Sequence, residues 1–136
     1  MNKVCTTVQQ SRRLLNLGLD PESADMIWCL VAKDKDEICT LCVKAWSGSL
    51  QWQGQDIAMP AWSLSALLEL MPQRIRGPYG ELWHLGLEKD WDKVSYQVYY
   101  ENKNSFVRRT SKDPIDACIE MIEWLVKNGL IKTDKI

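Results

Sequence analysis

The chain has 136 residues, of which 46% are hydrophobic and 26% charged, and its formal net charge is −1 at pH 7. These values are typical of a folded globular protein and exclude extensive disorder. Because proteins that bind nucleic acid usually carry a basic excess, the charge also makes nucleic acid an unexpected partner. The length predicts a single domain over residues 1–136.

The first predicted element is a helix that begins at Thr7 and ends at Gly18. Thr7 and Gln10 have the spacing of a capping box, in which each side chain bonds the backbone amide of the other residue. Gly18 can adopt the left-handed conformation that ends many helices. Asp20 and Pro21 then predict a second, much shorter helical segment.

A β-hairpin is predicted next. The apolar runs 26–32 and 38–46 flank the charged segment 33–37, which we expect to form the loop between two strands. Residues 49–54 are a candidate third strand. The hairpin is therefore the first β element of the fold.

The following segment predicts a helix and then a three-stranded antiparallel meander. Leucine and methionine recur at helical spacing within 60–72, and a proline ends that segment. The loop 73–80 leads to candidate strands 81–88, 93–100 and 105–110. Apolar and polar residues alternate in the middle strand, which is typical of a sheet that is buried on one face.

The last predicted helix begins after Asp113, an N-cap residue that precedes Pro114 at the first helical position. Asp116 favours the helix N-terminus and Gly129 closes the helix. The order of the elements predicts an α+β domain. We expect a mostly antiparallel sheet, made of the hairpin and the three-stranded meander, with two to three helices packed on one face.

The cysteines predict buried free thiols, because they form an odd set scattered through apolar segments: Cys5, Cys29, Cys39, Cys42 and Cys118. Cys39 and Cys42 have the Cys-x-x-Cys spacing of zinc ligands and of redox pairs. No second ligand pair follows, and the flanking residues predict a strand, whereas a redox pair favours a helix N-terminus. We therefore expect neither a metal nor a cofactor, with Cys39 and Cys42 as the alternative metal ligands.

The stretch FVRRTSKDP, residues 106–114, raises the possibility of an anion site. Successive strand residues point to opposite faces, so Arg108 and Arg109 do not converge on one ligand. The carboxylate of Asp113 would also repel an anion at the helix N-terminus that it caps. We therefore interpret this stretch as an edge strand followed by a capped helix.

His84 is the chain's one histidine and alternates with apolar residues, so we expect it at the surface. No phosphate-binding glycine loop, metalloprotease helix or nucleophile elbow accompanies it. An enzyme is therefore not the favoured hypothesis.

The aromatic residues favour a contact surface for another protein. Trp91 lies in a charged predicted loop with no apolar neighbours, and an exposed tryptophan there, with Tyr79 and Tyr99 nearby, would form such a surface. With His84 and Arg108 they form our candidate binding set. Burial of all seven tryptophans is the alternative interpretation.

A membrane location is not expected, because the longest unbroken apolar run, 26–32, is far shorter than the ~20 residues of a spanning helix. The N-terminal segment lacks the apolar core of a signal peptide. We therefore expect a cytoplasmic protein.

Three segments, 18–26, 60–72 and 113–129, resemble short uncharacterised proteins encoded in bacterial prophages and mobile elements. The resemblance implies a bacterial setting and an accessory role for a phage or mobile element, and it carries over no functional residue. Together with the exposed aromatics, it favours a non-catalytic protein that binds another protein. A small-molecule or nucleotide binder with a tryptophan-lined pocket is the alternative hypothesis, and a monomer is slightly favoured over an oligomer.

Overall fold

The computed structural model describes residues 3–33, 36–43, 51–52, 55–56, 58–92 and 94–131. Its helices are α1 (Val8–Asn16), α2 (Leu64–Leu70) and α3 (Pro114–Lys127), with a short 3-10 helix, η1 (Pro21–Ser23). Its strands are β1 (Met26–Lys33), β2 (Asp36–Val43), β3 (Gln51–Trp52), β4 (Gln55–Asp56), β5 (Ala58–Ala61), β6 (Arg74–Arg76), β7 (Leu82–Lys89), β8 (Tyr96–Glu101) and β9 (Phe106–Ser111).

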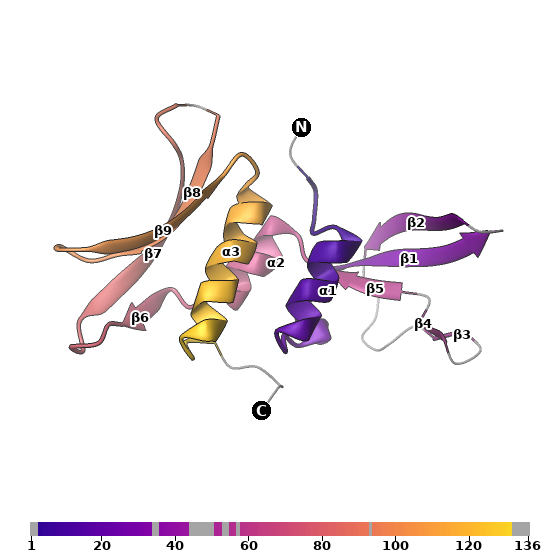
Figure 1. The fold of residues 1–136 in the computed structure, drawn as a ribbon, viewed down its shortest axis with the longest axis horizontal. Coiled ribbons are helices and arrows are strands. Elements are labelled where there is room, and N and C mark those ends of the chain that lie inside the picture. Colours follow the sequence, from indigo (N-terminus) through magenta and orange to yellow (C-terminus); the bar gives the residue numbers. More distant parts are fainter. Residues whose placement is uncertain are drawn as a thin grey trace.

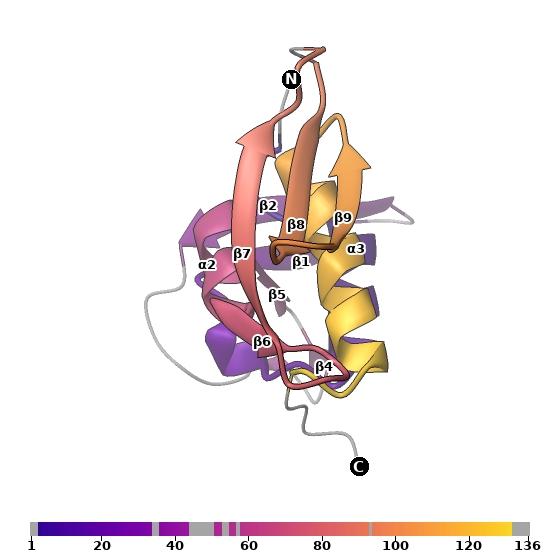
Figure 2. The same ribbon diagram turned by 90° about the vertical axis from the view of Figure 1, so that its left-hand side faces the viewer.

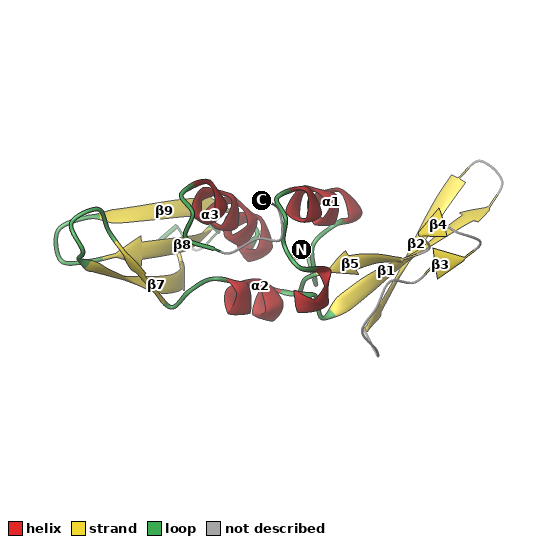
Figure 3. Ribbon diagram, turned by 90° about the horizontal axis from the view of Figure 1, so that it is seen from below, coloured by secondary structure: helices red, strands yellow, loops and turns green. Residues whose placement is uncertain are grey.

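The strands form antiparallel sheets with the orders β2-β1-β5, β3-β4 and β6-β7-β8-β9. The helices lie between the three-stranded and the four-stranded sheet, as Figure 1 shows from one side and Figure 3 from below. The α+β class, the hairpin and the meander are therefore confirmed. The hairpin and the meander lie in separate sheets, and the helical layer separates them.

The N-terminal half follows the predicted capping signals. Thr7 and Gln10 form the capping box at the start of α1, and Gly18 has the left-handed φ of 98° that ends the helix. Asp20 caps η1, whose first residue is Pro21. Both predicted helix starts are confirmed.

The hairpin differs from the prediction in its loop and in its third strand. Lys33 pairs with Asp36, so the strands extend further into the charged segment than the predicted loop 33–37 allows. The third strand of this sheet is β5, which pairs with β1, whereas β3 pairs with β4. Pro60 lies within β5, which is tolerated because β5 is the edge strand of its sheet.

Thr6 joins the N-terminal segment to the start of α2. Its backbone amide donates to the carbonyl of Trp62 at 2.9 Å, and its hydroxyl accepts from the amide of Trp62 at 3.1 Å. The same hydroxyl lies 2.8 Å from the hydroxyl of Ser11, and the indole of Trp28 donates to the Thr6 carbonyl at 2.8 Å. Thr6 is fully buried, so these bonds satisfy polar groups that water does not reach.

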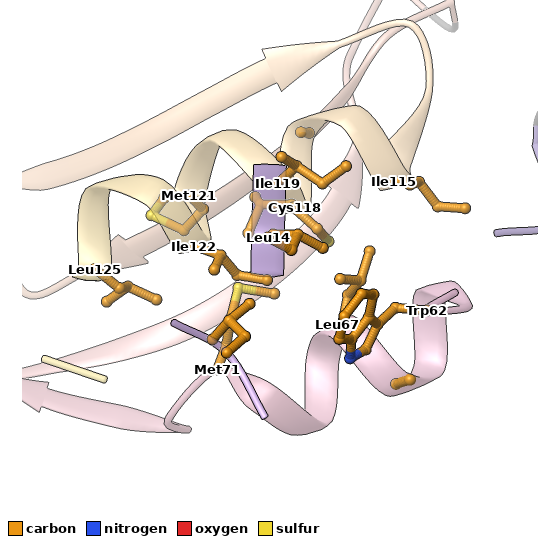
Figure 4. Close-up of a cluster of buried hydrophobic side chains, with 14 of the residues drawn as sticks. Leu14, Trp62, Leu67, Met71, Ile115, Cys118, Ile119, Met121, Ile122 and Leu125 are labelled. Carbon is orange, nitrogen blue, oxygen red and sulfur yellow. The ribbon is translucent and has the colours of Figure 1, made fainter. Parts of the chain in front are cut away.

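The core lies mainly between α3, α2 and the inner face of the four-stranded sheet. The apolar stripe of α3 packs against α2 and against β8 and β9. Figure 4 shows side chains of α3, among them Ile122, directed toward Met71, the residue that caps the C-terminus of α2. Trp62 is also fully buried and donates from its indole to the hydroxyl of Ser23 at 2.9 Å.

The four-stranded sheet contains one more strand than the sequence predicted. The meander is confirmed as β7, β8 and β9, and β6 adds three residues within the predicted loop 73–80. Residues that alternate along these strands face α2 and α3, and Val98 and Tyr100 are fully buried there. In the described part of the chain, no helix is both long and apolar enough to cross a membrane.

Candidate functional site

The four-stranded sheet has a second surface, which faces away from α2 and α3 and which we call the outer face. It carries the strand residues that alternate with those buried against the helices. In Figure 2 this face is turned toward the viewer, with α2 and α3 behind the sheet. Among the described residues, no helix or strand covers it. Its residues, placed by strand register and exposure, are Arg74, Arg76, Leu82, His84, Gly86, Glu88, Gln97, Tyr99, Glu101, Phe106, Arg108 and Thr110.

Tyr99 lies at the centre of the outer face, with its ring over Gly86. The two residues are register partners on β8 and β7, and a Cβ atom added at Gly86 would lie 2.2 Å from Cζ of Tyr99. Burial raises the pKa of the Tyr99 phenol, and the nearby carboxylates of Glu88 and Glu101 raise it further. The ring is therefore a partly buried platform with acidic neighbours.

Arg108 and Phe106 lie beside this platform on β9. Arg108 is the register partner of Tyr99, and its guanidinium lies 5.2 Å from the ring centroid of Phe106. On the other side of the tyrosine, Gln97 donates from its amide to Glu88 at 2.6 Å. A shallow hollow of about 250 Å³ lies here, lined by Glu88, Gln97, Tyr99, Glu101, Phe106 and Arg108.

His84 is exposed on the outer face, as predicted, and its register partners are Arg74 and Glu101. It borders a second hollow of about 360 Å³ beside the turn between β8 and β9. The described residues show no hydrogen bond from His84 to a carboxylate or a thiol. The geometry therefore places His84 on the exposed outer face and gives it no partner for acid-base chemistry in that part of the chain.

Among the aromatic residues whose exposure the structure describes, Trp91 and Tyr79 are the most exposed, at 90% and 93%, and they lie at opposite ends of β7. The strand between them has eight residues. At a rise of about 3.4 Å per residue, it separates the two turns by roughly 25 Å. The sequence interpretation that placed Tyr79 near Trp91 is therefore wrong, while Tyr99, Arg108 and His84 do share one face.

The turn that presents Tyr79 was not predicted as a structured element. Gly80 donates its amide to the carbonyl of Gly77 at 3.0 Å, and Gly80 has a left-handed φ of 83°. The Glu81 carboxylate accepts from the amide of Tyr79 at 2.9 Å and from the indole of Trp83 at 3.2 Å. The pKa of Glu81 is lowered, mainly because its carboxylate also accepts a hydrogen bond from its own backbone amide. The bonds from Trp83 and Tyr79 lower this pKa further. The Gly-Pro-Tyr-Gly order is the sequence signal that indicates such a turn.

The capped-helix interpretation of residues 106–114 agrees with the structure. The carboxylate of Asp113 accepts from the amides of Ile115 and Lys3, both at 2.8 Å. Arg108 points to the outer face, and Arg109 lies on the inner side of β9. The two guanidinium groups do not converge on the helix N-terminus.

The thiols that the structure describes are buried and free. Cys5 and Cys118 are both buried, and burial raises the pKa of the Cys118 thiol to about 12. Cys39 and Cys42 lie on β2, and their side chains are outside the described part of the chain. Within that part, no cluster of three or more His, Cys, Asp or Glu side chains is placed to hold a metal ion.

A third hollow, of about 530 Å³, lies between α1, α3 and β9. Its lining residues are Arg13, Leu17, Arg109, Glu120, Glu123, Trp124 and Lys127. Arg13 and Glu123 form an ion pair across it. One tryptophan borders this hollow among charged residues, which is not the tryptophan-lined pocket of the small-molecule hypothesis.

Comparisons with protein-family models, with curated proteins and with solved structures found no match for the chain.

Proposed function

We propose that the chain is a non-catalytic accessory protein of a bacterial phage or mobile element, and that it acts in the cytoplasm by binding another protein. The binding surface is the outer face of the four-stranded sheet, together with the turns that carry Tyr79 and Trp91. The origin and the location rest on the sequence resemblance, which implies a bacterial intracellular setting.

The position of the exposed apolar residues carries this proposal. The large hydrophobic side chains that are exposed in the described part of the chain are Val4, Tyr79, Leu82, Trp91, Val94 and Phe106. All of them except Val4 belong to the four-stranded sheet or its turns. Leu82 and Phe106 lie on the outer face, and the others lie in the turns at its ends. The exposed apolar area of the described residues is therefore concentrated in one sheet among charged residues, which is typical of a protein-binding site.

The chemistry of the outer face supports a protein as the ligand. Aromatic residues and arginine are the residue types that contribute most at protein interfaces, and Tyr99, Phe106 and Arg108 adjoin one another here. Glu88 and Glu101 border Tyr99 and would repel a nucleic-acid backbone. The hollows on this face are shallow and open, so they suit side chains of a partner surface better than an enclosed small molecule.

The proposal is tested by photo-crosslinking in the cells that naturally express the protein. The photoreactive residue benzoylphenylalanine replaces Phe106, which is 59% exposed on the outer face, or Gln9, which is exposed on α1. We expect a discrete protein adduct from position 106 and none from position 9. A nucleic-acid adduct at position 106, or no adduct there, would contradict the proposal.

A further inference from the structure

β9 is an edge strand with an unpaired side. It is the last strand in the order β6-β7-β8-β9, and its six residues, Phe106–Ser111, pair with β8 alone. Along its other side, no described strand satisfies the outward-pointing backbone amides and carbonyls. Such an edge is a template on which an extended segment of another chain adds as a further strand.

The edge is basic on both faces of the sheet. Arg108 points to the outer face and Arg109 to the inner side. Among the described residues, neither arginine pairs with a carboxylate: Arg108 lies over the ring of Phe106, and Arg109 donates to the backbone carbonyl of Arg108 at 2.8 Å. An incoming strand therefore meets two positive charges that the fold does not neutralise there.

The hollow of about 530 Å³ lies on the inner side of this edge, where Arg109 forms part of its rim. Trp124 of α3 and Leu17 of α1 give its walls apolar area, and its charged lining residues are of both signs, with Arg13 and Glu123 paired to each other. Side chains on one side of an added strand would enter this hollow, where Trp124 and Leu17 offer contact to apolar side chains. Side chains on its other side would lie next to Arg108.

We propose that the β9 edge binds an extended acidic segment of another protein as an added strand. Its acidic side chains lie beside Arg108 on the outer face, and its alternate apolar side chains enter the hollow beside Trp124. This inference rests on the proposed function, because the added strand is a segment of the protein partner that the proposed function requires. A second copy of β9 is a poor added strand, because antiparallel pairing about the centre of the strand would place Arg108 of one copy opposite Arg109 of the other.

The test uses two synthetic seven-residue peptides, one alternating valine with glutamate and the other alternating valine with lysine. Each is added to the full-length, isotope-labelled protein, and backbone amide exchange and chemical shifts are measured by NMR. We expect the glutamate peptide to slow exchange at β9 and to shift the indole signal of Trp124. The lysine peptide should do neither.

Charge reversal provides the matched comparison. Arg108→Glu should weaken binding of the glutamate peptide by about fivefold or more, because an attractive cross-strand pair becomes a repulsive one. The lysine peptide should then bind the variant more tightly. Arg12→Glu makes the same charge change at an exposed position of α1, outside the four-stranded sheet, and should leave both affinities unchanged.

Three results would overturn the inference: unchanged exchange at β9, equal binding of the two peptides to the wild type, or equal effects of Arg108→Glu and Arg12→Glu. If benzoylphenylalanine at position 106 captures a protein while the glutamate peptide leaves β9 unchanged, the edge inference fails and the proposed function stands. If position 106 captures no protein, the proposed function fails as well.

Discussion

The ring of Tyr99 lies over Gly86, its register partner on β7, and fills the space that a Cβ atom at position 86 would occupy. Any side chain at position 86 would force the ring to move, because the far end of the ring would be only 2.2 Å from that Cβ atom. This contact holds the ring against the outer face, between the carboxylates of Glu88 and Glu101. The position of Tyr99, at the centre of the proposed binding surface, therefore depends on the absence of a side chain at Gly86 on the neighbouring strand.

Gly86→Ala should displace the Tyr99 ring into solvent. Because burial is the main cause of the raised pKa of Tyr99, that pKa should fall toward the ordinary value of a tyrosine. The free energy of unfolding should change by about 1 kcal/mol or less, the range of one cross-strand aromatic contact. NMR titration of the tyrosine Cζ signals measures the shift. Thr110→Ala, on the same face, is the control, and an unchanged Tyr99 pKa in Gly86→Ala would contradict the assigned contact.

Thr6→Val should destabilise the protein, because it keeps the shape of the side chain and removes the hydroxyl. The amide of Trp62 and the hydroxyl of Ser11 would then lose their buried partner. We expect a loss of about 1–3 kcal/mol in the free energy of unfolding, measured by urea denaturation. Thr6→Ser retains the hydroxyl and should lose about 1 kcal/mol or less. Equal losses in the two variants would show that the hydrogen bonds contribute little.

Asp113→Ala should weaken the start of α3. The carboxylate accepts hydrogen bonds from the amides of Ile115 and Lys3, so its removal leaves both donors unpaired. Loss of an N-cap costs about 1–2 kcal/mol, and chemical denaturation should report a decrease of that size. Asp113→Asn keeps an acceptor oxygen and should be closer to the wild type. A wild-type stability in the alanine variant would exclude a capping role.

The stability of the protein should fall with rising pH above about 9, in part because of Cys118. Burial raises its pKa in the folded state to about 12, against an ordinary value of 9.0 for the unfolded chain. The contribution of the protonated Cys118 thiol to the free energy of unfolding is therefore complete below pH 9 and is lost as the pH rises from 9 to 12. The slope reaches at most about 1.4 kcal/mol per pH unit for one group.

Cys118→Ala should show a smaller decrease in the free energy of unfolding between pH 8 and pH 10.5. Burial is the main cause of the raised pKa of Tyr100, and Cys118 is a secondary cause, so most of the tyrosine's contribution is common to both proteins. Urea denaturation at several pH values measures the two slopes. Identical slopes would show that the Cys118 thiol ionises as easily in the folded protein as in the unfolded one.

The sequence predicted those elements that depend on local signals. The capping residues Thr7 and Asp113 precede apolar stripes, so both helix starts were visible in the order of residues alone. β6 was missed because it has three residues with a single apolar one, Ile75, between two arginines. β5 was missed because Pro60 argues against a strand unless the strand lies at an edge.

The candidate site was only partly predictable, because it depends on strand register. Alternation along the strands placed His84 on the surface correctly and predicted that Arg108 and Arg109 point to opposite faces. The contact between Tyr99 and Gly86 requires the pairing of β7 with β8, which a single sequence does not specify. The distance between Tyr79 and Trp91 follows from the length of β7, because the two residues lie in the turns at the two ends of that strand.

The central claim is that the outer face binds a protein, and the most direct measurement uses the partner captured at position 106. The affinity of that purified partner is compared for the wild type, for the double variant Leu82→Ser and Phe106→Ser, and for Gln9→Ser on α1. We expect the double variant to bind at least about tenfold more weakly, as for the loss of a central apolar contact, and Gln9→Ser to bind like the wild type. Equal affinity of all three proteins would contradict the assignment of the binding surface to the outer face.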